Sequence, residues 1–434
     1  MPNSNQGIST LAPTEHDTFQ AVACPFCGLH CDDLAVANRA GRLSVERNGC
    51  VRAKAGFERI LPQATPLVDG KQATLDAAVA RAAGLIKAAR LPLFGGLGTD
   101  VEGMRGVMAL ADRAGGVVDH VLSTAQYRNT GVLQTKGWFM STLTETRNRA
   151  DLLIVVASDL DTHHPRFYER IAAPPQTMFE QADGARTIVL LGCGPRPASL
   201  SGRLVGTIID IACAAEATPA VLGYLRMLLK GAPVPADPPG GVSRVVLDDL
   251  AQRCKQAHYG VVVWAPQALT FTGADLAVQM ITDLVRDLNK TTRFAGLSLG
   301  GNDGAASAAS VCSWQSGYPL RVSFAGGAPD YDPYRYEIAR MLRAGEGDLV
   351  VWVSSFGPEA QGPPETSLPT IVLGTPGIAL RKPSDVFIPV ATPGLDHSGR
   401  LVRCDAVVSL PLKQVRSSPH PRLADVTSAI TAAL

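Results

Sequence analysis

The stretch 145-ETRNRADLLIVVASDLDTHHPRFYERI-171 indicates how this chain folds. At its centre, residues 151–157 form a short apolar run of β-branched character, which is typical of a strand in a parallel sheet. A polar segment that contains a proline follows the run. A strand followed by a turn and a helical pattern is the unit from which parallel sheets are built.

Runs of the same kind recur, and most are followed by a Gly- or Pro-containing turn and then a helical pattern. This repetition predicts an α/β fold with several Rossmann-like lobes, each built on a parallel sheet. The chain has no internal repeat at solenoid spacing and no low-complexity tract. The other predicted strands are 91–97, 187–191, 260–265, 294–299, 348–353, 369–373 and 386–390.

One helix can be placed from its capping signal. Thr74 is a suitable N-cap, and Asp76 lies in the first turn, where a carboxylate is favourable. The apolar face of this helix would pack against the strand at 91–97. That face comprises Leu75, Val79, Ala82, Ala83, Ile86 and Ala89.

The clearest linker is 231-GAPVPADPPGG-241, because its four prolines leave little room for a helix or a central strand. At 434 residues the chain is also too long for one ordinary domain. We therefore expect a cysteine-rich N-terminal domain at 1–66, an α/β lobe at 67–232 and a second α/β lobe at 242–434.

Composition narrows the classes of partner. The formal charge is +1, and 18% of residues are charged, below the roughly 25% that is usual in soluble domains. A surface so poor in charge suits a subunit that is buried among protein partners. No run of lysine and arginine forms a stripe that could follow a phosphate backbone, so we exclude nucleic acid as a partner.

Targeting signals are not evident. Residues 1–20 contain neither an apolar core nor a twin-arginine pair, and no apolar run reaches the length of about 18 residues that a membrane span needs. We therefore expect a cytoplasmic chain that does not enter a membrane. Nine cysteines, an odd number, then indicate thiols or metal ligands more than disulfides.

Four of these cysteines form a motif. Cys24, Cys27 and Cys31 have C-x2-C-x3-C spacing in 24-CPFCGLHCDDL-34, and Cys50 follows in NGCVRAKAG. This spacing lets one loop wrap three thiolates around a compact centre that a fourth thiolate closes. The residues alone leave three alternatives, which are a [4Fe-4S] cluster, zinc, or an inherited loop that holds neither. His30 could replace one thiolate, although a turn histidine is more often solvated. We interpret the remaining cysteines as small core or interface residues; they are Cys193, Cys213, Cys254, Cys312 and Cys404.

A cysteine quartet ahead of repeated βαβ units resembles the molybdopterin oxidoreductase superfamily, and three segments narrow the resemblance. The stretch 145–171 is similar to the superfamily's central strand, and 384-SDVFIPVATPGLDHSGRLVRCDAVV-408 to its late strand and turn. The most diagnostic segment, 312-CSWQSGYPLRVSFAGGAPDYDP-333, resembles the B subunit of formylmethanofuran dehydrogenase. The resemblance implies lobes of the formate dehydrogenase/DMSO reductase type, without the C-terminal β-barrel of single-chain members.

Two departures from the family pattern bear on activity. Active members bind molybdenum or tungsten through a cysteine or selenocysteine followed by histidine, and the matching positions here are Ala125 and Gln126; no cysteine lies between Cys50 and Cys193. Ser123 or Ser141 would be the only substitutes for that thiolate. The family's G-x-N-P after the central strand is replaced here by Ala157, Ser158, Asp159 and Leu160, and an aspartate there opposes a dinucleotide pyrophosphate unless it merely caps the next helix.

Other family-like residues surround this region. His163, His164 and Arg166 are retained from the pattern and either line the old pocket or brace its loop, with bracing favoured. The turn 300-GGNDGA-305 could cradle phosphates through its amides, and Gly326 stands where active relatives carry an arginine. The resemblance therefore implies the remnant of a cofactor pocket from which molybdopterin is absent. Its residues are Ser123, Ala125, Gln126, Ser141, Asp159, His163, His164, Arg166 and Asn302.

A chain that keeps the superfamily's fold but lacks its redox ligands resembles the B subunit of bacterial formyltransferase/hydrolase complexes. The resemblance implies a redox-inactive scaffold, with amidohydrolase-like, formyltransferase and glutamate-synthase-like subunits as partners. In that family the complex converts formyl-tetrahydromethanopterin to formate through a methanofuran-type carrier during formaldehyde oxidation. The alternative is an active molybdenum- or tungsten-pterin formylmethanofuran dehydrogenase subunit, so whether the chain itself is an enzyme stays open. A free-standing metal-binding or sensor protein is a third class, which the large multi-lobe body disfavours.

Overall fold

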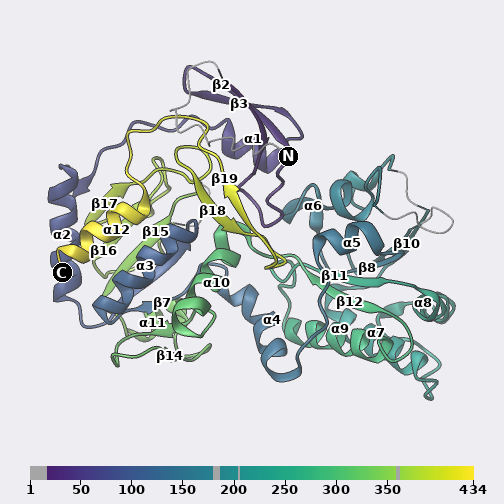
Figure 1. Ribbon diagram of the computed structural model, residues 1–434. Helices are drawn as coiled ribbons and strands as arrows, with labels where there is room; N and C mark the ends of the chain where they lie inside the picture. The colour runs from purple at the N-terminus through teal and green to yellow at the C-terminus, as the bar shows by residue number, and fades with distance from the viewer. Residues whose placement is uncertain (1–16, 179–185, 204–205, 358–361) are drawn as a thin grey trace, which may run out of the picture.

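The computed structural model describes residues 17–178, 186–203, 206–357 and 362–434. Two α/β bodies lie side by side, each around one large sheet, and a small β-rich head lies above them (Figure 1). The head contains an antiparallel three-stranded sheet and the short helix α1 (Val51–Phe57). Its strands are β1 (Thr18–Val22), β2 (Leu34–Arg39) and β3 (Arg42–Arg47).

The first body is built on a five-stranded, wholly parallel sheet in the order β10-β9-β8-β11-β12. Its central strand β8 has the sequence LLIVV, and all five residues are buried, as expected where helices cover both faces. The strands are β8 (Leu152–Val156), β9 (Thr187–Leu191), β10 (Thr207–Ile211), β11 (Gly260–Trp264) and β12 (Phe294–Ser298). The helices of this part of the chain are α4 (Ser123–Lys136), α5 (Leu143–Arg149), α6 (Leu160–His163), α7 (Thr218–Leu229), α8 (Arg244–Gln256) and α9 (Ala274–Leu288).

The second body is built on a nine-stranded mixed sheet in the order β14-β13-β7-β6-β15-β16-β17-β4-β5, with five parallel strands, β7 to β17, at its centre. Its strands are β4 (Leu67–Val68), β5 (Lys71–Gln72), β6 (Pro92–Gly98), β7 (Val117–Val118), β13 (Val322–Ser323), β14 (Asp330–Tyr331), β15 (Leu349–Ser354), β16 (Thr370–Gly374) and β17 (Val386–Pro389). Its helices are α2 (Leu75–Ala88), α3 (Val101–Ala114), α10 (Ala305–Ser316), α11 (Ile338–Ala344) and α12 (Leu423–Ala432). The hairpin of β18 (Gly399–Val402) and β19 (Ser409–Leu412) runs between the head and both bodies (Figure 1).

All eight apolar runs predicted as strands form strands, namely β6, β8, β9, β11, β12, β15, β16 and β17, and each pairs in parallel with a neighbour. The capped helix is also present as α2. Thr74 Oγ1 accepts a hydrogen bond from the Ala77 amide at 3.2 Å, and Val79, Ala82 and Ile86 are buried. Leu75 differs from the prediction, because it is exposed at the start of the helix.

The division into lobes differs from the one expected at 67–232 and 242–434. Strand β6 pairs with β15, so segments on both sides of the first body complete the second sheet. The proline-rich segment 231–241 lies between α7 and α8, and β10 and β11 on either side of it belong to one sheet. It is therefore a surface connection within a body, and the first body is inserted into the second.

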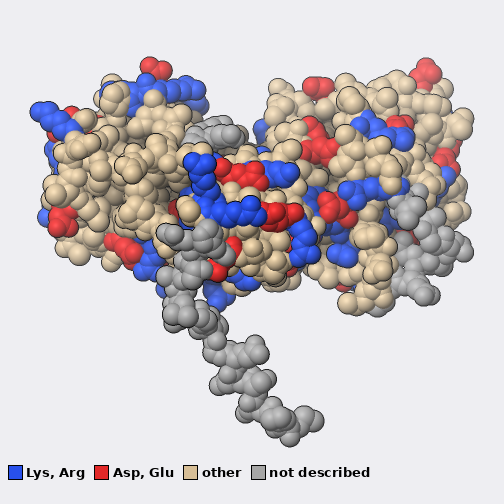
Figure 2. All heavy atoms as spheres, turned by 90° about the horizontal axis from the view of Figure 1, so that it is seen from above, with Lys and Arg blue, Asp and Glu red and all other residues tan. Residues whose placement is uncertain are grey.

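The surface agrees with the sparse charge of the sequence. Seen from above, basic and acidic side chains gather in a band across the middle, with broad uncharged areas on either side (Figure 2). None of the helices among the described residues is long and apolar enough to cross a membrane.

The cap of α2 can be tested by substitution. Thr74→Ala removes the acceptor for the Ala77 amide and should lower the free energy of unfolding by about 1 kcal/mol, measured by urea denaturation. Thr74→Ser keeps a hydroxyl and should stay close to wild type. An alanine variant as stable as the serine variant would contradict the capping role.

Candidate functional site at the junction of the two bodies

The turn after β12, residues 300–304, is the point where the head and both bodies meet. Gly301, Asp303 and Gly304 have φ angles of 80°, 50° and 71°, in the left-handed region that favours glycine. Gly28 of the cysteine loop donates its amide to Asn302 Oδ1 at 2.9 Å. A Cβ atom on Gly28 would lie 1.8 Å from the Gly300 carbonyl oxygen, so only glycine fits there. The Asn302 side chain, predicted to belong to a remnant cofactor pocket, is thus engaged by the head.

The two retained histidines take part in the same junction. A ring N–H of the fully buried His164 donates from Nε2 to the Gly300 carbonyl at 3.2 Å, and Asn302 Nδ2 donates to the His163 carbonyl at 3.4 Å. Burial lowers the pKa of His164 to about 3, so the ring is neutral at physiological pH. These contacts agree with bracing of the loop, the role favoured from sequence.

A third histidine at this turn was missed by the sequence analysis. His120 Nε2 donates to the Asp303 carbonyl at 3.1 Å, and its Nδ1 accepts the Leu122 amide at 3.0 Å. Burial lowers the pKa of His120 to about 4. The sequence signal for this histidine is the polar pair Asp119 and His120, which directly follows the apolar strand β7. Ligand sites of parallel sheets lie just beyond the carboxyl ends of strands.

The two serines proposed as substitute metal ligands do not lie together. Ser123 Oγ accepts the backbone amide of His120 at 3.0 Å, which closes the turn before α4. Ser141 Oγ accepts from the Thr146 hydroxyl at 3.0 Å and lies 3.1 Å from the Tyr259 hydroxyl, in the first body. Both serine side chains are buried and serve the local fold.

The positions that match the family's metal ligands lie on the first turns of α4. Ala125 is half-buried, and Gln126 Oε1 is buried with no hydrogen-bond partner in the described part of the chain. After β8, Ala157 has a φ of 44°, so the backbone keeps a glycine-type conformation where the family pattern has glycine. Asp159 is exposed and is the N-cap of α6, accepting from the Thr162 amide at 3.2 Å. The capping role considered from sequence is therefore present.

The cysteine loop is held by its own backbone. The Cys24 amide donates to the Cys31 carbonyl at 2.8 Å, and the His30 amide to the Cys27 carbonyl at 3.1 Å. His30 is buried, not solvated, and its Nδ1 donates to the Cys24 carbonyl at 3.1 Å. Cys50 is the N-cap of α1, with Sγ accepting the Ala53 amide at 3.5 Å.

The four thiols are close enough to affect one another. The pKa of Cys24 is raised by burial and by the neighbouring Cys27, Cys31 and Cys50, and that of Cys27 is raised to about 12 by burial and by Cys31. Yet no group of three or more His, Cys, Asp or Glu side chains within the described ranges is arranged to hold a metal ion. A metal or cluster at the four cysteines therefore stays a prediction.

Cys404 packs against the core cluster that contains the cysteine loop. Its amide donates to the Gly28 carbonyl at 3.0 Å, and a Cβ atom on Gly28 would lie 3.1 Å from its own Cβ. Burial, Asp405 and Cys27 raise the pKa of its thiol. It is therefore a fifth thiol beside the cysteine loop, whereas Cys254 and Cys312 are core residues as expected.

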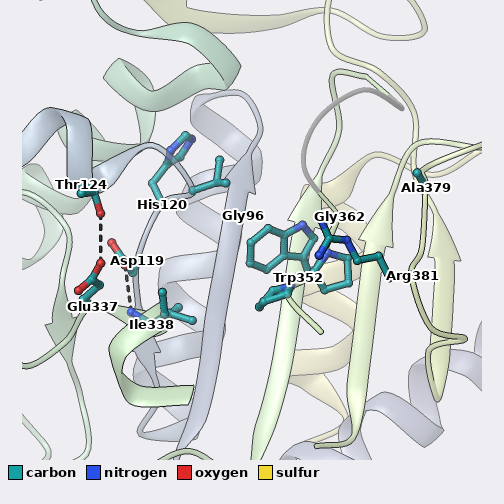
Figure 3. Close-up of a pocket in the computed structure, with 14 residues that line it drawn as sticks. Gly96, Asp119, His120, Thr124, Glu337, Ile338, Trp352, Gly362, Ala379 and Arg381 are labelled. Atoms are coloured by element: carbon teal, nitrogen blue, oxygen red, sulfur yellow. Dashed lines mark hydrogen bonds between the residues drawn. The ribbon is translucent and has the colours of Figure 1, made fainter. Parts of the chain in front are cut away.

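A cavity of about 630 Å³ opens at the carboxyl ends of β6 and β15, the edge at which parallel sheets usually hold ligands. Asp119, His120, Thr124 and Glu337 line one side, and Trp352 and Arg381 the other (Figure 3). The two hydrogen bonds drawn there join Thr124 to Glu337 at 3.2 Å and the Ile338 amide to Asp119 at 3.1 Å. None of the nine residues predicted as a pocket remnant lines this cavity.

Asp119 is the buried carboxylate of this cavity. Arg321 Nε donates to Asp119 Oδ1 at 3.4 Å, and the Arg321 guanidinium lies 4.5 Å from the centre of the Tyr127 ring. Burial raises the pKa of Asp119 to about 6 against the opposing effect of Arg321. Nearby, the buried hydroxyls of Ser354, Ser355 and Thr375 lack hydrogen-bond partners among the described residues. This edge of the sheet therefore contains buried polar groups that the described part of the fold does not satisfy.

Comparison with known proteins gives the following relatives. No protein-family model matches the chain. The B subunit of the formyltransferase/hydrolase complex Fhc of Methylorubrum extorquens is 32% identical over 338 residues, which cover 77% of this chain and 87% of that protein. The B subunit of the tungsten-containing formylmethanofuran dehydrogenase 2 of Methanococcus maripaludis is 26% identical over 428 residues, covering 94% of this chain and 96% of that protein.

Solved structures agree with the sequence relatives. A chain of the formyltransferase/hydrolase complex FhcABCD from Methylorubrum extorquens, solved with methylofuran, superposes with a TM-score of 0.72 at 29% identity, covering 85% of this chain and 98% of that chain. Acetylene hydratase from Pelobacter acetylenicus has a TM-score of 0.61 at 10% identity, covering 97% of this chain and 69% of that chain, which is a likeness of fold alone.

The fold is therefore the mixed α/β architecture with parallel sheets that these two structures share. Within that class, the chain belongs to the family of the B subunit of formyltransferase/hydrolase complexes, whose homologues include the B subunit of formylmethanofuran dehydrogenases. The resemblance drawn from the sequence is confirmed.

The glycine contact at the junction can be tested. Gly28→Ala places a methyl group against the Gly300 carbonyl and should lower the free energy of unfolding by about 3 kcal/mol or more, measured by chemical denaturation. The control is Gly84→Ala, because a Cβ atom there meets nothing within 4 Å on helix α2 and should be neutral or slightly stabilising. Equal stability of the two variants would show that the junction tolerates a side chain.

The raised pKa of Asp119 predicts a dependence of stability on pH. The stability that protonated Asp119 contributes to the fold is fully present below the pKa of this residue in the unfolded chain, about 4. It is lost as pH rises through about 6, because the buried carboxylate then ionises. Asp119→Asn cannot ionise, so its free energy of unfolding relative to wild type should become more favourable between pH 4 and 7, by at most about 1.4 kcal/mol per pH unit. Urea denaturation at several pH values measures this. Parallel pH profiles would contradict the assignment.

Proposed function

We propose that this chain is a redox-inactive scaffold subunit of a cytoplasmic formyltransferase/hydrolase complex. The complex would convert formyl-tetrahydromethanopterin to formate through a methanofuran-type carrier during formaldehyde oxidation. Family membership supports the proposal that the chain is a subunit of such a complex. One observation supports the proposal that the chain has no redox activity. By the spacing of the family pattern, the metal ligand and its histidine would fall near Ala125 and Gln126, and no cysteine lies between Cys50 and Cys193.

The surroundings of those positions support the same conclusion. The Ser123 and Ser141 hydroxyls are committed to a turn and to the Tyr259 contact, so neither is free to replace the missing thiolate. Asp159, at the end of the central strand, is engaged as the N-cap of α6, so it gives no reason to expect a bound pyrophosphate at that edge. The residues present do not fit a molybdenum or tungsten pterin, and we assign the chain no redox step.

The partners follow from the relative's complex. FhcABCD comprises four subunits and was solved with methylofuran. By analogy, we propose amidohydrolase-like, formyltransferase and glutamate-synthase-like subunits as companions of this chain, and a methanofuran-type molecule as the carrier. The broad uncharged areas of the surface in Figure 2 suit contact with protein partners. The two bodies would correspond to Rossmann-like lobes of the formate dehydrogenase/DMSO reductase type.

The cysteine quartet is proposed to be structural. Cys24, Cys27, Cys31 and Cys50 would hold a [4Fe-4S] cluster or zinc, or they form an inherited loop that holds neither. The backbone hydrogen bonds of the loop support its structural role in each case. Iron, acid-labile sulfide and zinc contents distinguish the three alternatives.

The alternative function is an active molybdenum- or tungsten-dependent formylmethanofuran dehydrogenase subunit, which the relative from Methanococcus maripaludis supports at 26% identity. The two functions predict different companions and different metals. They can therefore be separated on one purified sample.

The test is purification of the tagged chain from its native host. A formyltransferase and an amidohydrolase should co-purify, the preparation should release formate from formyl-tetrahydromethanopterin, and molybdenum and tungsten should be far below one atom per chain. Elemental analysis and mass spectrometry measure this. Stoichiometric metal with extractable pterin would overturn the scaffold proposal in favour of the dehydrogenase.

A further inference from the structure

A second cavity, of about 640 Å³, opens beside the cysteine loop and shares no lining residue with the cavity at β6 and β15. Four arginines line it, against two carboxylates, so its wall has a net positive charge. Apolar residues of the segment 173–175 form another part of the wall. The arginines are Arg147, Arg166, Arg170 and Arg203.

Arg166 binds both carboxylates that line the cavity. Its Nη1 and Nη2 donate to the two oxygens of Asp33 at 2.6 and 2.8 Å, and Nη2 also donates to Glu169 Oε1 at 2.6 Å. The Arg166 side chain is buried, and the pair geometry is bidentate. Asp33 and Glu169 are thus held by one cation. Arg170 pairs with Asp32 at 2.7 Å and lies 3.8 Å from Asp33. With Asp32 counted, four arginines stand against three carboxylates, so the wall keeps a net positive charge.

Arg147 and Arg203 are the least engaged of these arginines. Among the described residues, Arg147 donates one hydrogen bond, from Nη2 to the Gln176 carbonyl at 3.3 Å. Arg203 donates one, from Nε to the Ser199 carbonyl at 2.6 Å, and its Nη2 lies 3.8 Å from Glu169 Oε2. A guanidinium has five N–H donors, so most donors of both side chains stay available to a ligand in the cavity.

A further arginine lies behind the wall and makes it rigid. Arg186 is 5% exposed and, within the described ranges, donates only to carbonyls, including those of Arg147 at 2.7 Å and Ala172 at 2.7 Å. These bonds tie helix α5, which carries Arg147, to the segment at 171–172. Arg186 forms no ion pair with any described residue, so its charge adds to the positive potential of the cavity.

We propose that this cavity binds a small molecule through a carboxylate or phosphate group, which the guanidinium groups of Arg147 and Arg203 would hold. Arginine pairs recognise planar or tetrahedral oxyanions through parallel N–H donors, and the cation behind the wall increases the attraction. The volume exceeds that of one oxyanion, so the rest of the ligand would lie against Ala173, Pro174 and Pro175. The proposal does not depend on the proposed function of the complex.

The test is calorimetric titration of the full-length chain, purified with whatever partners accompany it, with inorganic phosphate and separately with citrate at constant ionic strength. At least one probe should bind saturably, and preference between them identifies the oxyanion as phosphate or carboxylate. Arg147→Gln and Arg203→Gln should each weaken binding about tenfold or more, because each removes charge-assisted hydrogen bonds.

The matched control is Arg149→Gln, on the same helix but outside the cavity lining, with a side chain that is 52% exposed. It changes the net charge equally and should bind like wild type. Equal thermal unfolding midpoints would exclude a folding defect in either cavity variant, and two independent variants keep the test decisive if one fails to fold. No saturable binding of either probe, or equal weakening in Arg149→Gln, would overturn the proposal.

Discussion

The backbone of the cysteine loop touches the backbone of the turn after β12 with no side chain between them, at Gly28 and Gly300. Around this contact, His164 reaches the turn from the first body and His120 from the second. A Cβ atom at Gly304 would lie 2.4 Å from the Thr99 carbonyl, so the turn is equally close to the end of β6. The head and both bodies therefore all contact this turn.

This constraint gives the residues around the turn a structural role of their own. The turn at 300–304 and its two histidines hold the architecture together whether or not a cofactor is present, so their retention carries no information about redox chemistry. Ala157 illustrates the same point, because its backbone stays in a glycine-type conformation after the glycine of the family pattern has been replaced. By contrast, Ala125 and Gln126, near which the metal ligand and histidine of active relatives are expected, offer a methyl group and an amide.

The local sequence pattern was sufficient to predict the strands and one helix. Strands that are buried on both faces consist of β-branched, apolar runs, and Thr74 marks the N-cap of the helix. It could not give the pairing of β6 with β15, because strand partners far apart in sequence are chosen by tertiary packing. It also misplaced the boundary at 231–241, where proline marks a loop but not the edge of a body. For the site, the family resemblance found His163, His164 and Asn302, whereas Asp119, His120 and Cys404 were missed because only the fold brings their short segments to the junction.

The interleaved order of the two sheets has a consequence for synthesis on the ribosome. Strand β6 ends at Gly98, but its neighbour β15 begins only at Leu349, about 250 residues later. At a translation rate of roughly 5–20 residues per second, β6 therefore waits about 10–50 s for its partner, while the inserted body can already complete its own sheet. During that interval an apolar strand edge is exposed in the nascent chain, so early capture by a chaperone or a companion subunit would favour correct assembly.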